Sequence, residues 1–160
     1  MAGLSVFPKQ LRASTQHPNI VYVRDDEHYA VHGRPAVGRA VVLTEGESGI
    51  AIYEGHPKDL EKNVTAVYRN DSALAVPTGR VLVRFAEGVD ASTHAEIIAK
   101  AGYRIDLQLA YAPNAAWLCN CENDIAEALS HIEDLEKMPD VENVEPQLLS
   151  PRALKLNPDR

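Results

Sequence analysis

From residue 80 onward, successive segments of the chain each follow one hydrophobic period, and the order of these periods restricts the available folds. In residues 80–85, RVLVRF, Val81, Val83 and Phe85 alternate with Arg80, Leu82 and Arg84, which is typical of a strand with one apolar face. Residues 91–102 then carry apolar side chains at helical spacing. Asp90 suits the N-cap of that helix and Gly102 its C-terminal end. A strand and a helix therefore come first.

A second set of strands and a helix follows. Residues 104–111 and 115–121 alternate as two further strands. Asn123 is expected to cap a second helix, which Pro139 ends. Residues 141–145, VENVE, form the fourth strand. The order strand, helix, strand, strand, helix, strand predicts an α+β fold of the ferredoxin-like type, in which two helices cover one face of an antiparallel sheet.

Alternation along the strands assigns the side chains to two sheet faces. We expect the helices to cover Val81, Val83, Phe85, Ile105, Leu107, Leu109, Trp117 and Cys119. The opposite, open face would then carry Arg80, Leu82, Arg84, Arg104, Asp106, Gln108, Ala116, Leu118 and Asn120. A mixture of polar groups with two leucines suits a non-obligate protein interface. A solvated face, or one covered by residues 20–75, is the alternative that this composition leaves open.

Changes in residue composition divide the rest of the chain into segments. Residues 1–19 form a polar lead-in that we expect to be loosely held. Residues 20–76 contain short runs rich in Val, Ile and Tyr between charged or glycine-containing breaks, which predicts a small β-rich region of unknown role. The ferredoxin-like domain is expected over residues 79–149. Residues 150–160 are expected to form an extended C-terminal tail.

The composition argues against several classes of partner. The 160 residues carry a formal net charge of −7 and contain no basic run, so no nucleic-acid partner is expected. No stretch approaches the roughly 18 apolar residues of a membrane helix, so no membrane partner is expected. The N-terminus lacks the apolar core of an export signal. We therefore expect a cytoplasmic protein, or a secreted one if a leader has been removed.

No residue pattern predicts catalysis, a metal site or a cofactor. Cys119 and Cys121 are two residues apart, which suits a disulfide poorly, and structural zinc normally takes four ligands. We expect both cysteines to behave as small apolar side chains. His28, His32 and His56 follow no recognised ligand spacing. Since the chain also lacks the G-x-S-x-G motif and a phosphate loop, we expect that it is not an enzyme.

Three segments resemble those of a known family. VLVRFAEGVD, residues 81–90, covers the first strand and the turn after it, and MPDVENVEPQ, residues 138–147, covers the last strand. NDIAEALSHIEDLEKMPDVENVEP, residues 123–146, adds the second helix. Their order and spacing resemble the propeptides of subtilisin-type serine proteases, the inhibitor I9 family, which includes fervidolysin-like N-terminal prodomains. The resemblance covers about residues 79–149.

The resemblance implies an inhibitor and folding assistant of a subtilisin-type serine protease. In this family the open sheet face lies on a pair of protease surface helices, and an acidic residue after the last strand caps the N-termini of those helices. The C-terminal tail enters the substrate cleft as an added strand. Carried over residue by residue, the implied protease-binding residues are Leu82, Leu118, Glu145, Gln147, Leu148, Leu149, Ser150, Pro151, Arg152, Ala153 and Leu154.

Three of these residues determine how the protease would be bound. Glu145 matches the acidic cap, whereas Gln147 stands where many relatives have Asn or an acid. Pro151 has no N–H to donate and should lie where its side chain, and not its backbone, faces the enzyme. That register places the residue for the specificity pocket within residues 152–154.

Met1 and the extra β-rich region at residues 20–75 favour a stand-alone protein over an excised propeptide. The alternative function is that of a regulatory or small-ligand-binding ferredoxin-like domain, because this fold hosts many functions. The extended apolar tail distinguishes the two functions, since a regulatory domain does not need one. The sequence leaves the target protease and the oligomeric state open.

Overall fold

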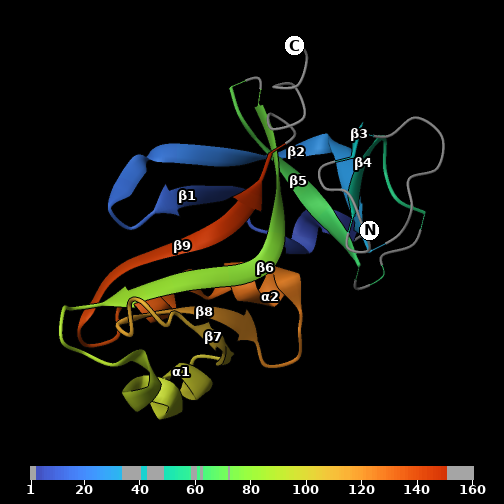
Figure 1. The fold of residues 1–160 in the computed structure, drawn as a ribbon. Coiled ribbons are helices and arrows are strands. Elements are labelled where there is room, and N and C mark those ends of the chain that lie inside the picture. Colours follow the sequence, from blue (N-terminus) through green and yellow to red (C-terminus); the bar gives the residue numbers. More distant parts are fainter. Residues whose placement is uncertain are drawn as a thin grey trace, which may run out of the picture. The chain divides into compact units, whose positions relative to one another are not determined.

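The computed structural model of the chain describes residues 3–33, 41–42, 49–58, 61, 63–71 and 73–150 (Figure 1). The chain forms two compact units. The first unit contains the described parts of Met1–Gln10, Tyr22–Pro77 and Leu148–Arg160. The second unit contains Leu11–Val21 and Thr78–Gln147. Both units therefore draw on parts of the chain that are far apart in the sequence.

The first unit is an antiparallel sheet of Val- and Ile-rich strands. Across the sheet its strands are β3 (Val41–Val42), β4 (Ile50–Glu54), β2 (His17–His32), β5 (Val64–Asn70) and the first part of β6 (Ala73–Phe85). β-Branched side chains favour this pleated, half-buried setting. The core of this unit consists of Ala30, Ile50, Ile52, Val67 and Val76, with Leu74 and Leu149 packed against it.

The segment predicted to be a loose lead-in is part of the fold. The short 3₁₀ helix η1 (Gly3–Val6) is followed by Phe7, whose side chain is 5% exposed. The hydroxyl of Tyr68 on β5 donates to the Pro8 carbonyl at 2.6 Å, and the Arg24 guanidinium donates to the Phe7 carbonyl at 2.8 Å. The prediction is therefore wrong for this segment, because one buried aromatic ring and a few backbone hydrogen bonds suffice to fix a short polar stretch.

Strand β2 is interrupted by a bulge after Asp25, where its register against β5 shifts. The buried Asp25 carboxylate accepts hydrogen bonds from the Arg69 guanidinium at 2.6 and 3.0 Å and from the backbone N–H of Glu27 at 2.8 Å. The His28 ring Nδ1 lies 3.2 Å from the same carboxylate. Burial acts to raise the pKa of Asp25, but the hydrogen bonds from Arg69, Glu27 and His28 outweigh it and lower the pKa.

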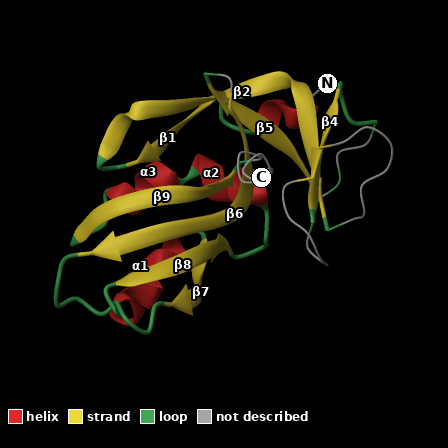
Figure 2. Ribbon diagram, turned by 45° about the horizontal axis from the view of Figure 1, so that its top comes forward, coloured by secondary structure: helices red, strands yellow, loops and turns green. Residues whose placement is uncertain are grey.

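The second unit alternates strands and helices in the predicted order. After β6 come η2 (Ala91–His94), α1 (Ala95–Lys100), β7 (Tyr103–Gln108), β8 (Ala115–Asn120), α2 (Ile125–Ser130), α3 (Ile132–Glu136) and β9 (Val141–Leu149). In the sheet, β9 pairs with β6, β6 with β8, and β8 with β7. Figure 2 shows the helices on one side of these four strands. The predicted α+β class, dominated by an antiparallel sheet, is confirmed.

The helix ends follow from their capping residues. Asp90 caps η2, because its carboxylate accepts from the Ser92 backbone N–H at 2.8 Å. The second cap is one residue later than predicted: Asp124, and not Asn123, accepts from the Glu127 N–H at 3.0 Å. Asn123 instead takes a positive φ of 60° in the preceding turn. The second helix is also divided into α2 and α3 at His131.

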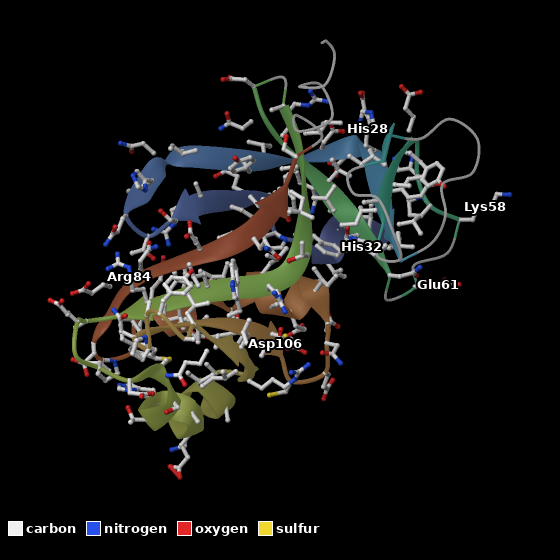
Figure 3. The ribbon with its side chains drawn as sticks, in the orientation of Figure 1. His28, His32, Lys58, Glu61, Arg84 and Asp106 are labelled. Atoms are coloured by element: carbon white, nitrogen blue, oxygen red, sulfur yellow. The ribbon has the colours of Figure 1, made fainter. Side chains whose placement is uncertain are left out.

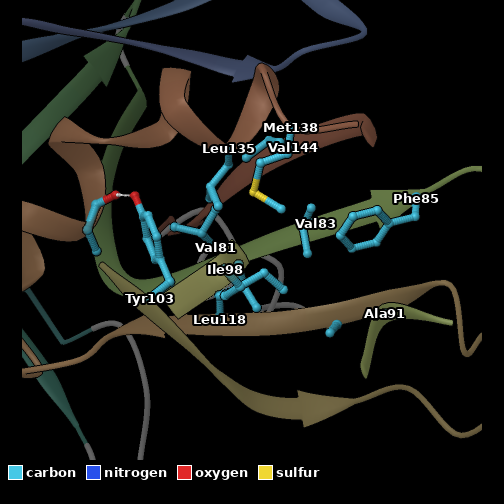
Figure 4. Packing of buried hydrophobic residues seen from close by; sticks show 12 residues of the cluster. Val81, Val83, Phe85, Ala91, Ile98, Tyr103, Leu118, Leu135, Met138 and Val144 are labelled. Atoms are coloured by element: carbon cyan, nitrogen blue, oxygen red, sulfur yellow. Dashed lines mark hydrogen bonds between the residues drawn. The ribbon is translucent and has the colours of Figure 1, made fainter. Parts of the chain in front are cut away.

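The core of the second unit lies between the sheet and the helices (Figure 4). Its buried residues are Val81, Val83, Phe85, Ala91, Ile98, Tyr103, Ala116, Leu118, Ala128, Leu135, Met138 and Val144. The Tyr103 hydroxyl donates to the Ala128 carbonyl, so the one hydroxyl in this core is satisfied. No helix in the described ranges is long and apolar enough to cross a membrane.

The turn between β1 (Gln10–Ser14) and β2 belongs to the second unit, which differs from the predicted division at residue 79. The Thr15 backbone N–H donates to the Val144 carbonyl on β9 at 3.0 Å, and the Thr15 hydroxyl lies 2.6 Å from the Glu136 carboxylate. The Arg12 guanidinium donates to both oxygens of Glu136 at 2.5 and 2.7 Å. Contacts between such distant residues are absent from local sequence patterns, which explains the difference.

Candidate partner-binding face

The two faces of β6 are as predicted. Val81, Val83 and Phe85 have no exposed surface and belong to the core. Arg80, Leu82 and Arg84 alternate with them, are half-buried, and lie on the open face, which points away from the helices. The faces of this strand were predictable because both arginines fall on one face and Val81, Val83 and Phe85 on the other.

The faces of β8 are the reverse of the prediction. Leu118 and Ala116 are fully buried and belong to the core, so Leu118 is unable to line the open face. Alternation therefore places Trp117 and Cys119, both half-buried, on the open face. The prediction failed because both faces of this strand carry apolar residues. Pairing with β6 decides the orientation, since Val81 lies opposite Leu118.

A bulge in β7 changes the sheet face on which Leu107 lies. The register against β8 shifts between Ile105 and Leu107, so that Leu107, and not Asp106, lies opposite Trp117. Leu107 is 52% exposed and does not face the helices as predicted. An extra residue in one strand turns the following side chain to the other face. The strand also ends at Gln108, three residues earlier than predicted.

Because Trp117 and Leu107 both lie on the open face, an apolar row crosses three strands. Leu82 on β6 lies opposite Trp117 on β8, and Trp117 lies opposite Leu107 on β7. Directly opposed side chains in a sheet have Cβ atoms about 4.5–5.5 Å apart, so the three are neighbours. We refer to Leu82, Trp117 and Leu107 as the apolar row.

Charged side chains lie beside the apolar row. The Arg80 guanidinium lies 2.6 Å from the Asp106 carboxylate, and its Cζ is 6.0 Å from the centre of the Trp117 ring. Arg104 lies 3.6 Å from the same carboxylate. Figure 3 labels Asp106 together with Arg84, which pairs with Glu142 on β9 at 3.1 Å. The charged residues that border the apolar row are Arg80, Arg84, Arg104, Asp106 and Glu142.

The two cysteines are not the buried apolar side chains that the sequence predicts. Cys119 is half-buried and Cys121 is exposed, and both are free thiols. Burial, and then the nearby Asp106 carboxylate, raises the pKa of the Cys119 thiol, which makes it a poorer nucleophile at neutral pH. Within the described residues, no group of three or more His, Cys, Asp or Glu side chains is arranged to hold a metal ion.

The residues predicted on β9 differ in how they are held. Val144 is in the core, so alternation directs the half-buried Glu145 to the opposite face. No hydrogen bond or ion pair engages the Glu145 side chain in the part of the chain that the structure describes. Gln147, in contrast, accepts a hydrogen bond from the Thr78 hydroxyl at 2.7 Å.

Two of the implied protease-binding residues, Leu148 and Leu149, lie in the last strand. Leu148 and Leu149 belong to β9, and Leu149 packs against the core of the first unit, so these two residues are not part of a free tail. Ser150 follows the strand and is half-buried. Pro151, Arg152, Ala153 and Leu154 lie outside the described residues.

The histidines of the first unit have separate surroundings. His28 contacts Asp25, whereas Nε2 of His32 lies 2.9 Å from the hydroxyl of the fully buried Thr65. Burial lowers the pKa of His32 to about 4, so its ring is neutral at pH 7. Local contacts thus explain His28 and His32, and His56 is exposed.

One small pocket lies at the end of the second unit's sheet. Its volume is about 160 Å³, and it is lined by Thr78, Gly79, Arg80, Cys119, Asn120, Asn123, Asp124 and Ile125. Ligand pockets usually enclose about 300–1,000 Å³, so this one is too small for most metabolites. The Asn120 side-chain oxygen is already occupied by the backbone N–H groups of Glu122 and Asp124.

Comparison of the chain with protein-family models, with curated proteins and with solved structures gave no match. The function of this face is therefore inferred from the residues that form it. Sequence patterns identified Leu82 and Glu145 but missed Trp117 and Leu107, which reach the face through strand pairing and a bulge.

Proposed function

We propose that the chain is a non-enzymatic protein that inhibits a subtilisin-type serine protease, assists its folding, or does both. In this proposal the second unit is a ferredoxin-like domain of the propeptide type. The observation that carries the proposal is a four-stranded sheet with helices on one side only, whose other face presents the apolar row and leaves Glu145 without a partner among the described residues. Such a face suits a protein partner better than a small ligand.

The proposed binding mode has two described elements. The open face lies against the protease, where half-buried apolar side chains lose their remaining contact with water. Glu145 supplies an anion to the N-termini of helices on the protease, where unpaired N–H groups and the helix dipole favour negative charge. Because Gln147 is bonded to Thr78, Glu145 is the residue on β9 that is available for this contact.

The C-terminal tail is the proposed inhibitory element. It would enter the substrate cleft as an added strand, so that its backbone pairs with the enzyme and alternate side chains fill pockets. Since Leu148 and Leu149 are held in β9, this element begins after Leu149. The family resemblance supports this part of the proposal.

Replacing Glu145 tests the capping contact. We expect Glu145→Gln to weaken inhibition of a responsive subtilisin about 10-fold, because it removes an anion from a helix N-terminus, where a charge is worth up to about 2 kcal/mol. The control is Glu133→Gln, which removes a similar charge from an exposed position on α3. The measurement is the inhibition constant for each variant, and equal constants for all three proteins would exclude the capping role.

A further inference from the structure

We infer that Cys119 and Cys121 form a two-thiolate site for a soft monovalent cation, copper(I), at the end of β8. They are the two cysteines of the chain, and both are free thiols. The site lies within the second unit and needs no protease, so it is independent of the proposed function.

Strand pairing holds both cysteines on one face of the sheet. Cys119 lies opposite Arg104 on β7, and the Cys121 N–H donates to the Gly102 carbonyl at 2.9 Å, so the pairing continues one residue beyond β8. Alternation then directs both side chains to the open face. Cys119 is half-buried and Cys121 is exposed. An ion therefore reaches the thiols from solvent without any opening of the core.

The spacing of the two cysteines suits an ion between the sulfurs better than a disulfide. A strand rises about 3.3 Å per residue, so residues two apart on one face are about 6.6 Å apart. A disulfide needs Cβ atoms about 3.8 Å apart and would require the backbone to move. A thiolate–zinc bond is about 2.3 Å long, so two sulfurs on opposite sides of an ion of similar size are about 4.6 Å apart. Rotation of the side chains about χ1 gives that separation on a regular strand.

The number of available ligands selects the metal. Soft thiolate ligands favour zinc, iron–sulfur clusters and copper(I). Structural zinc and iron–sulfur clusters take four protein ligands. Among the described residues, no group of three or more His, Cys, Asp or Glu side chains is arranged to hold a metal ion. Copper(I) forms linear complexes with two thiolates, so it is the ion that this pair fits.

The charges beside Cys119 favour the bound form. Two thiols release two protons when they bind one monovalent cation, so the complex carries one negative charge. Arg104 lies opposite Cys119, and Arg80 lines the same small pocket as Cys119. These two guanidiniums share the Asp106 carboxylate, at 2.6 Å from Arg80 and 3.6 Å from Arg104. One positive charge is therefore left to offset the charge of the complex.

Competition for copper(I) tests the site. The full chain, with its thiols reduced, is titrated in the absence of oxygen into the coloured complex of copper(I) with bicinchoninate, and the loss of colour gives the stoichiometry and the dissociation constant. We expect one ion per chain. Cys119→Ser and Cys121→Ser should each weaken binding by at least about 100-fold, because loss of a supporting group around a metal already costs 10–100-fold. If Cys119→Ser lowers the melting temperature, Cys121→Ser decides, because Cys121 is exposed.

A double variant separates the geometry of the pair from the number of thiols. Cys121→Ser combined with Ser130→Cys keeps two thiols, but moves one to an exposed position on α2, on the helix side of the sheet (Figure 2). This variant should bind copper(I) as weakly as Cys121→Ser alone. Binding as tight as that of the unaltered chain would show that any two thiols suffice and would overturn the inference.

X-ray absorption at the copper edge identifies the ligands directly. With one equivalent of copper(I) bound to the full chain, we expect two sulfur atoms at bonding distance and no nitrogen or oxygen. A single sulfur, or three or more sulfurs from an ion shared between copies of the chain, would overturn the two-thiolate site. So would an unaltered chain that binds copper(I) no more tightly than Cys121→Ser.

Discussion

At the scale of single residues, the fold constrains the charge of the His32 side chain. Its ring lies against the fully buried Thr65 hydroxyl, and the Asn63 side-chain amide donates to the His32 carbonyl at 3.2 Å. Burial holds the pKa of the ring at about 4, below its usual value of 6.5, because a charged imidazolium is poorly solvated there. Protonation therefore acts against the folded first unit.

Stability should depend on pH through His32. The folded state binds this proton less readily than the unfolded state. The free energy of unfolding is therefore highest above pH 6.5, and the contribution of the neutral ring is lost as the pH falls toward about 4. The loss amounts to up to about 3 kcal/mol. Urea denaturation at pH 7 and pH 4.5 measures it.

Two variants separate this effect from general acid denaturation. In His32→Gln, the difference in unfolding free energy between the two pH values should shrink by most of that amount, because glutamine does not titrate. His56→Gln, at an exposed position, is the control and should keep the full difference. A pH dependence unchanged by His32→Gln would show that this ring does not carry it.

At the scale of elements, the turn between β1 and β2 covers the outer edge of β9. The Thr15 hydroxyl accepts from the Val144 N–H at 3.0 Å, and the Thr15 N–H donates to the Val144 carbonyl. Pro146, two residues further along β9, has no N–H, and by alternation its nitrogen faces the same edge. An outer strand protected in this way offers little for edge-to-edge pairing, which favours binding through the sheet face.

Removing the Thr15 hydroxyl tests this edge contact. We expect Thr15→Val, which keeps the shape of the side chain, to lower the free energy of unfolding by about 1–3 kcal/mol, because it leaves the Val144 N–H without its acceptor. Thr15→Ser keeps the hydroxyl and should lose less than half of that. Chemical denaturation followed by Trp117 fluorescence measures both, and equal losses would contradict the role of the hydroxyl.

The sequence determined some elements better than others for physical reasons. On β6, Arg80 and Arg84 mark one face while Val81, Val83 and Phe85 mark the other, so its two faces were predictable. On β8, Ala116 and Leu118 are as apolar as Trp117 and Cys119, and tertiary pairing decides which pair is buried. The bulge at Asp106 depends on the neighbouring strand and leaves no local pattern. The contacts of Thr15 with β9 join residues nearly 130 positions apart.

At the scale of the whole molecule, the two units are interleaved along the chain. β2 and β6 each contribute residues to both units, and Leu149, at the end of β9, completes the core of the first unit. A segment restricted to residues 79–149 would lack the Arg12 and Thr15 contacts to Glu136. Binding experiments should therefore use the full chain.

The most direct test of the proposed function is the residual peptide hydrolysis by a panel of subtilisin-type proteases titrated with the full chain. We predict that at least one member loses activity with a stoichiometry of one chain per protease, while a trypsin-like protease of unrelated fold keeps its activity. Unchanged hydrolysis by every subtilisin at micromolar concentrations of the chain would contradict the proposal.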